Sequence, residues 1–148
     1  MKHPIFLLLL SCLSLAQCTK ESSYKPPEDL AQAKSLWESK KIDSYTMTFN
    51  VSCFCIVDLN KPAEVVVKKN KIITVNGIAY DNSFPLYGSY KTIQELFSHI
   101  EEMQKKNPVV EELEFDTTYG FPSYIYYDVS EMIADEEIGY RVSDFKPQ

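Results

Sequence analysis

The sequence predicts an α+β domain in which a single antiparallel sheet of about five to six strands carries two helices on one face. Segments with helical and strand-like hydrophobic patterns follow each other in the order helix, three strands, helix, three strands. The connections between these segments are short, which favours antiparallel pairing. The two amphipathic helices need an apolar sheet face to cover, so we expect them on the same side of one sheet.

The first helix and the first strand are expected over residues 28–41 and 44–55. Leu30, Ala33 and Trp37 recur at helical spacing, with acidic residues before them and lysines after them that complement the helix dipole. We expect the single tryptophan to anchor the core. After residue 44, apolar and polar side chains alternate with a period of two, which is typical of a half-buried strand.

A tight hairpin is expected next. Two β-branched runs, at residues 63–68 and 71–76, flank a Lys-Asn pair, and asparagine tolerates the positive φ that a two-residue turn requires. Such a turn places Lys68 opposite Lys71, a mild repulsion that suits a solvent-facing edge.

The second helix has the clearest signals in the chain. Thr92 and Glu95 form a capping box in sequence, with a hydroxyl at the cap and a carboxylate three residues later. Asn107 and Pro108 supply a left-handed residue and a stop. The apolar stripe between these ends comprises Ile93, Leu96, Phe97, Ile100 and Met103.

Three more strands are expected after this helix, at residues 109–116, 123–129 and 138–145. The turn that separates the first two of these strands is the Tyr-Gly-Phe-Pro segment at residues 119–122. The order of the strands in the sheet does not follow from these patterns.

The first 17 residues are interpreted as an export signal. A short basic start precedes an apolar run of roughly 13 residues, less than the ~20 that a membrane-spanning helix needs. Leu15-Ala16-Gln17-Cys18 resembles a bacterial lipobox, which predicts signal cleavage and acylation of Cys18. Two alternatives stay open: a lipobox that ends at Cys12, and ordinary cleavage after Ala16, which would give a soluble secreted protein.

The expected organisation is a signal peptide over residues 1–17, a flexible tether over 18–27 and a single α+β domain over 28–148. The chain carries 15 basic and 21 acidic residues, a net charge of −6, which argues against a nucleic-acid partner. We therefore expect membrane attachment through the N-terminal lipid, and a domain that faces the periplasm or the cell exterior. A protein partner is possible, but the sequence does not identify one.

Cys53 and Cys55 are the one pair of residues in the sequence that could support redox exchange or bind a thiophilic metal. Strand alternation places both sulfur atoms on the apolar face, and their Cα atoms would be about 6.6 Å apart in a regular strand. A disulfide therefore needs the strand to bend or end there, while an extracytoplasmic location favours oxidation. Three interpretations stay open: a structural disulfide, two reduced core cysteines, or a functional pair for redox exchange or thiophilic metals.

The acidic stretch that includes Asp128, Glu131 and Asp135 is a candidate calcium site, because hard cations bind carboxylate oxygens. The spacing does not follow an EF-hand loop, so a solvated connection between strands is the favoured alternative. His99 is the only histidine outside the signal segment, and we expect it on the helix surface rather than in a zinc site. No other metal site, no cofactor and no catalytic residue is predicted, since motifs for nucleophilic catalysis and phosphate binding are absent.

The chain contains 10 tyrosines, several of them between residues 119 and 127. Tyrosine is suited to recognition surfaces, because it combines a rigid ring with a polar tip. It is equally suited to strands with one wet face, which is the favoured interpretation here.

Several segments together resemble an uncharacterised family of small bacterial secreted proteins and lipoproteins, domain of unknown function 6174. The residues that carry the resemblance are Trp37, Ile42-Asp43-Ser44-Tyr45, Ser52-Cys53-Phe54-Cys55, the lysine-rich hairpin, Tyr119-Gly120-Phe121-Pro122 and Ile133-Ala134-Asp135-Glu136-Glu137-Ile138-Gly139-Tyr140. The resemblance implies an extracytoplasmic α+β domain and supports an acylated N-terminus, but it implies no reaction.

The sequence therefore predicts a lipid-anchored extracytoplasmic domain of unknown activity that is a non-enzymatic binding or structural interaction module. The alternative is a thiol-dependent redox or metal-handling protein that uses Cys53 and Cys55.

Overall fold

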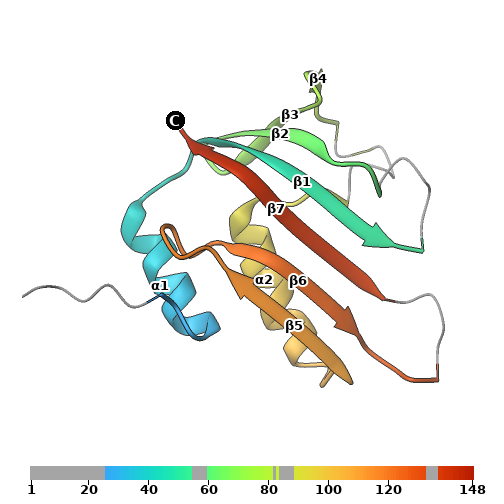
Figure 1. Ribbon diagram of the computed structural model, residues 1–148. Helices are drawn as coiled ribbons and strands as arrows, with labels where there is room; N and C mark the ends of the chain where they lie inside the picture. Colours follow the sequence, from blue (N-terminus) through green and yellow to red (C-terminus); the bar gives the residue numbers. More distant parts are fainter. Residues whose placement is uncertain (1–25, 55–59, 82, 84–88, 133–136) are drawn as a thin grey trace, which may run out of the picture.

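The computed structural model describes residues 26–54, 60–81, 83, 89–132 and 137–148. These residues form the predicted α+β arrangement, with two helices and a single antiparallel sheet (Figure 1). The elements are α1 (Leu30–Lys40), β1 (Tyr45–Cys53), β2 (Ala63–Lys68), β3 (Lys71–Val75), β4 (Ile78–Ala79), α2 (Ile93–Gln104), β5 (Val110–Phe115), β6 (Pro122–Asp128) and β7 (Ile138–Pro147).

The sheet has seven strands in the order β4-β3-β2-β1-β7-β6-β5, so the prediction of five to six strands was wrong. The missed strand is β4, which pairs with β3 through Ile78 opposite Val75. Asn76 and Gly77, both with positive φ, reverse the chain between these two strands. A strand of two residues has no measurable period, which is why the hydrophobic pattern does not reveal it.

β1 is the central strand, and it confirms the predicted alternation. Tyr45, Met47, Phe49 and Val51 are each at most 1% exposed, and they point toward the side of the sheet on which the helices lie. The side chains between them point to the opposite face and are only half-buried or exposed.

α1 begins at the N-cap Asp29, whose side chain accepts a hydrogen bond from the Gln32 amide, and it ends at Lys41 in a left-handed conformation. Trp37 is 4% exposed and meets the rings of Tyr45, Phe121 and Phe145 edge-on. The expectation that the single tryptophan anchors the core is therefore confirmed.

α2 has the capping box that the sequence predicts. The Thr92 hydroxyl accepts a hydrogen bond from the Glu95 amide, and the Glu95 carboxylate accepts one from the Thr92 amide. The predicted apolar stripe is buried throughout. The Ile93 amide, which has no partner inside the helix, donates a 2.7 Å hydrogen bond to the buried hydroxyl of Tyr45 on β1. The start of α2 is thus tied directly to the central strand.

The β2–β3 hairpin has the predicted turn, with Lys68 paired opposite Lys71 and positive φ at both residues between them. The hairpin is not the edge of the sheet, because β4 continues the sheet beyond β3.

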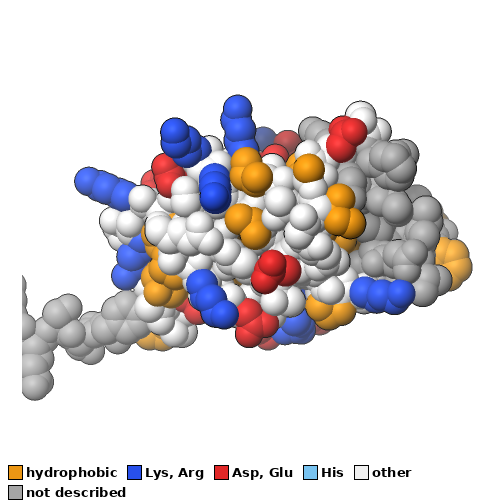
Figure 2. All heavy atoms as spheres, turned by 90° about the horizontal axis from the view of Figure 1, so that it is seen from above, with side chains coloured by type: hydrophobic (Ala, Val, Ile, Leu, Met, Phe, Trp, Pro, Cys, Tyr) orange, Lys and Arg blue, Asp and Glu red, His pale blue; other side chains and the backbone are white. Residues whose placement is uncertain are grey.

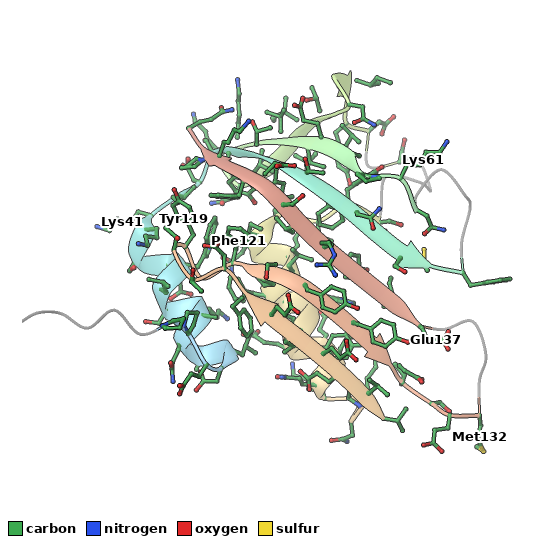
Figure 3. The ribbon with its side chains drawn as sticks, in the orientation of Figure 1. Lys41, Lys61, Tyr119, Phe121, Met132 and Glu137 are labelled. Carbon is green, nitrogen blue, oxygen red and sulfur yellow. The ribbon has the colours of Figure 1, made fainter. Side chains whose placement is uncertain are left out.

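The turn between β5 and β6 packs on α1, as Figure 3 shows for Tyr119 and Phe121. Gly120 has a φ of +83°, and a Cβ atom there would lie only 2.4 Å from the Ala33 carbonyl oxygen. Glycine at this position therefore allows both the left-handed turn and the close approach of the backbone to the helix.

Candidate binding groove on the open sheet face

One face of the sheet packs against the helices, and no described helix or strand covers the other. In Figure 1 the strands lie in front of α2, so this open face is turned toward the viewer. Because residues paired across strands share a face, the register defines two rows of side chains here. One row joins Asn50, Arg141 and Tyr124, and the next joins Ser52, Gly139 and Tyr126.

These rows line two neighbouring depressions, which we call the open-face groove. The first depression, of about 250 Å³, is lined by Asn50, Ser52, Tyr124, Gly139, Tyr140 and Arg141. The second depression, of about 310 Å³, is lined by Ser52, Cys53, Phe54, Tyr126 and Glu137. Ser52 belongs to both depressions, so the groove follows β7 between walls formed by β1 and β6.

Gly139 forms part of the floor of the groove. A Cβ atom at this position would make ordinary contacts with Ser52 Cβ at 3.5 Å and with Tyr126 Cδ2 at 3.6 Å. The position thus accommodates a side chain without strain, and such a side chain would fill the space between the two walls.

Arg141 is the only arginine in the chain. Its guanidinium carbon lies 4.4 Å from the centroid of the Tyr124 ring, the geometry of a cation–π contact. The side chain is exposed, and it makes no hydrogen bond or ion pair with any described residue. Its N–H groups therefore remain available for a ligand.

The β1 wall supplies one hydrogen-bond acceptor and one group that can donate or accept a hydrogen bond. The Asn50 side-chain amide donates a 2.9 Å hydrogen bond to the Asn60 carbonyl, which leaves the Asn50 side-chain oxygen as an acceptor. The exposed Ser52 hydroxyl makes no hydrogen bond with a described residue, so it can donate or accept.

The tyrosines divide between the two faces of the sheet. Tyr124 and Tyr126 are half-buried on the open face, whereas Tyr127 is buried on the helix side. Desolvation, with a contribution from nearby carboxylates that include Glu137, raises the pKa of Tyr126. Its phenol therefore stays protonated at neutral pH as a hydrogen-bond donor.

The predicted cysteine cluster lies at one end of this groove. Cys53 is the last residue of β1, half-buried against the core. It is disulfide-bonded, and its partner lies outside the described residues. Cys55 and the predicted lipidation site Cys18 also lie outside the described residues, so the pairing and the acylation stay predictions.

The candidate calcium site is described only in part. An Asp128 carboxylate oxygen accepts a hydrogen bond from the Ser130 amide within a turn, Glu131 is exposed, and Asp135 lies outside the described residues. Among the residues that the structure describes, no three His, Cys, Asp or Glu side chains are grouped to hold a metal ion.

His99 is more deeply placed than the expected surface position. Its ring meets Tyr140 and Tyr127 edge-on, at centroid distances of 5.2 and 6.2 Å, and its buried Nε2 atom has no hydrogen-bond partner. Desolvation, assisted by the positive charge of Lys91, lowers the pKa of His99 to about 4. The helix flank that carries this residue faces the rings of β6 and β7, a contact that helical spacing alone does not show.

The sequence alone does not reveal the groove, although it contains part of the signal. The alternation in β1 places Asn50 and Ser52 on the polar face of that strand. Arg141, the only arginine in the chain, lies in the strand predicted over residues 138–145. What was missing was the strand order, which brings Arg141 between these residues and the tyrosines of β6.

Among the described residues, no helix is both long enough and apolar enough to cross a membrane. Searches of curated proteins and of solved structures found no match. The model of one family, described as a family of unknown function (DUF6174), matches residues 29–147. This match covers most of the chain, and the protein therefore belongs to the DUF6174 family.

Proposed function

We propose that this protein is an exported, N-terminally lipidated domain that acts by binding rather than by catalysis, and that the open-face groove is its binding surface. The observation that carries the proposal is an uncovered sheet face that holds the only arginine of the chain, with its N–H groups free, beside two tyrosines and two polar side chains. Recognition surfaces typically combine such rigid aromatic side chains with adaptable polar groups.

The distribution of shifted pKa values supports binding over catalysis. Burial raises the pKa of Tyr45 and Tyr127, raises that of Tyr140 to about 12 and lowers that of His99. These are the largest pKa shifts among the described residues, and all four side chains pack on the helix side of the sheet. In the groove the pKa of Tyr126 is also raised, but this shift keeps the phenol neutral and does not make it a base.

The proposed anchor is the lipid on Cys18, followed by the tether over residues 18–27. Several acyl chains on one residue exceed what stable membrane attachment requires, so an acidic domain needs no basic surface to stay bound. The domain would face the periplasm or the cell exterior. A soluble secreted form is the alternative.

Metabolic labelling with palmitate tests the anchor. We expect label on the wild-type chain and on Cys12→Ser, the matched control, but none on Cys18→Ser. Globomycin should also block processing of the wild-type chain. Unchanged labelling of Cys18→Ser would contradict the assignment.

A photo-crosslinking amino acid tests the binding surface in intact cells. Placed at position 126 on the open face, it should form a specific adduct that disappears when Arg141→Gln is added. Placed at position 98, on the exposed side of α2, it should form no such adduct. Equal adducts from both positions, or none from position 126, would contradict the proposal.

A second candidate function is thiol chemistry at Cys53 and Cys55, favoured by the position of Cys53 in the lining of the groove. Mass spectrometry without reductant counts the free thiols directly. A bridge that survives a glutathione buffer supports a structural role, whereas ready reduction or stoichiometric metal uptake supports the thiol function.

A further inference from the structure

We infer that the open-face groove binds a short extended peptide and that Arg141 holds one carboxylate of this peptide, which rests on the proposed binding function of the groove and gives it a class of ligand.

The position of the Arg141 guanidinium group favours a carboxylate ligand. The guanidinium group of Arg141 stacks on the Tyr124 ring at 4.4 Å, which restrains its plane while leaving its edges free. A carboxylate matches such an edge with two parallel hydrogen bonds. No described carboxylate already occupies this position, since Arg141 forms no ion pair with a described residue.

The shape of the groove suits an extended chain. Gly139 places no side chain on the floor, so Ser52 and Tyr126 stand on either side of bare backbone, each within 3.6 Å of where a Cβ atom would lie. The oxygen of the Asn50 side chain and the Ser52 hydroxyl offer an acceptor and a donor, which match the N–H and C=O groups of a peptide backbone. An extended segment that lies along β7 satisfies these groups without a bend.

The charges around the groove disfavour a polyanionic ligand. Glu112 and Glu114 on β5 are paired opposite Tyr126 and Tyr124, and Glu137 lines the far end. Polyanions require clustered cations, so these carboxylates disfavour a nucleic acid or a polyphosphate. They favour a ligand that carries a single carboxylate for Arg141.

The end of the groove that Glu137 lines suits a positively charged group of the ligand. Glu137 precedes β7, and Figure 3 places it at the end of the sheet away from Lys41 and Tyr119. It lies four residues before Arg141, about 13 Å at the rise of an extended strand. A segment of about four residues with an acidic end and a basic end therefore complements the groove in length and in charge.

The domain over residues 26–148 is suited to a binding experiment in solution. Every buried hydrophobic side chain of the described core lies between Ala33 and Val142, so this fragment contains all of that described core. We expect it to fold without the preceding residues.

The experiment is an NMR titration of this ¹⁵N-labelled domain with blocked tetrapeptides, N-acetylated and C-amidated. The probes are Lys-Ala-Tyr-Glu and its reverse, so that both directions along β7 are tested. At least one should cause saturable shifts at the amides of Ser52, Gly139 and Arg141. The same peptide with Gln in place of Glu should bind at least tenfold more weakly.

Substitutions in the groove test the assignment on the protein side. Arg141→Gln should weaken binding at least tenfold, and so should Gly139→Val, which fills the floor. The affinity of Arg141→Lys for the peptide should lie between that of these two variants and that of the wild type, because lysine keeps the charge but loses the bidentate geometry. Lys146→Gln removes a cation from the same strand outside the groove and should leave binding unchanged. Unfolding midpoints would show that each variant is folded.

Three results would overturn the inference: equal binding of the Glu and Gln peptides, absence of saturable shifts with every peptide, or binding that Arg141→Gln does not weaken.

Galacturonate and inorganic phosphate serve as further probes. Saturable shifts in the groove with either of these, while the peptides are inert, would assign a different anion and exclude the peptide. An Arg141-dependent adduct from position 126 in cells, without peptide binding in solution, would leave the binding function standing and remove only the ligand class.

Discussion

At the scale of single residues, Tyr45 connects the sheet to α2 through one hydrogen bond. Its hydroxyl accepts from the first amide of the helix, in a site where neither group reaches water. Tyr45→Phe leaves that amide without a partner, so we expect the free energy of unfolding to fall by about 1–3 kcal/mol. Urea unfolding measures this loss. Tyr126→Phe on the open face is the control and should change stability little; equal effects would contradict the role of the hydrogen bond.

His99 makes stability depend on pH. Its pKa in the folded protein is about 4, below the ordinary value of 6.5. Between these values the unfolded chain takes up a proton that the folded chain does not, so stability is full above about pH 6.5 and falls as the pH drops toward 4. Lys91 and Lys106 disfavour the protonated ring, while Glu102 favours it.

The expected result is a urea midpoint that is lower at pH 5 than at pH 7.5. His99→Phe keeps a ring against Tyr127 and Tyr140 and removes the titrating group, so the drop in the midpoint should become smaller. Carboxylates titrate at lower pH and supply the remaining dependence, which both proteins share. An equal drop in the variant would show that His99 is not responsible.

At the scale of elements, the capping box of α2 stabilises the helix start. Thr92→Ala removes the acceptor for the Glu95 amide, and we expect a loss of about 1 kcal/mol in the free energy of unfolding. Thr92→Ser keeps a hydroxyl at the same position and should retain most of the stability. A Thr92→Ala protein with an unchanged midpoint would contradict the contribution of this cap.

The contact between the β5–β6 turn and α1 depends on Gly120. Gly120→Ala combines a left-handed conformation, which costs about 1–2 kcal/mol for a residue with a side chain, with a clash against the Ala33 carbonyl. The matched control is Gly77→Ala, because Gly77 also has a positive φ, of +75°, but has no atom within 4 Å of the added carbon. We expect Gly120→Ala to lower the thermal midpoint clearly more than Gly77→Ala does. Similar midpoints would mean that the turn moves away from the helix at little cost.

At the scale of the whole molecule, exposed lysines gather at the end of α1 and around the β2–β3 turn. Figure 2 shows lysine and arginine side chains mainly on the left, the side on which Figure 3 labels Lys41. The exposed lysines Lys40, Lys41, Lys68, Lys69 and Lys71 form no ion pair with a described residue. The ion pair between Lys34 and Glu101, which joins the two helices, lies apart from them.

Salt should therefore stabilise the protein slightly. Screening weakens the repulsion among these lysines and the self-repulsion of a chain with a net charge of −6. We expect a higher unfolding midpoint in 500 mM than in 20 mM sodium chloride. A midpoint that falls with salt would indicate that attractive pairs dominate the surface.

Much of the fold was predictable because its elements have strong local signals. The period of two in β1, the capping box of α2 and the Lys-Asn turn each depend on residues within a few positions of one another. β4 was missed because two residues cannot show a period. The depth of His99 was missed because its neighbours, Tyr127 and Tyr140, come from strands distant in the chain.

The sequence alone determined which segments are helices and strands, which face of each is apolar and where the helices begin, since periodicity and capping are local properties. Only the tertiary structure decided that β7 lies between β1 and β6, and that Arg141 therefore stands between Asn50 and Tyr124. Strand order depends on pairing between segments far apart in the chain, and the energy of such pairing comes from packing across the whole sheet rather than from any local pattern. For this reason the candidate groove became visible only in the folded protein.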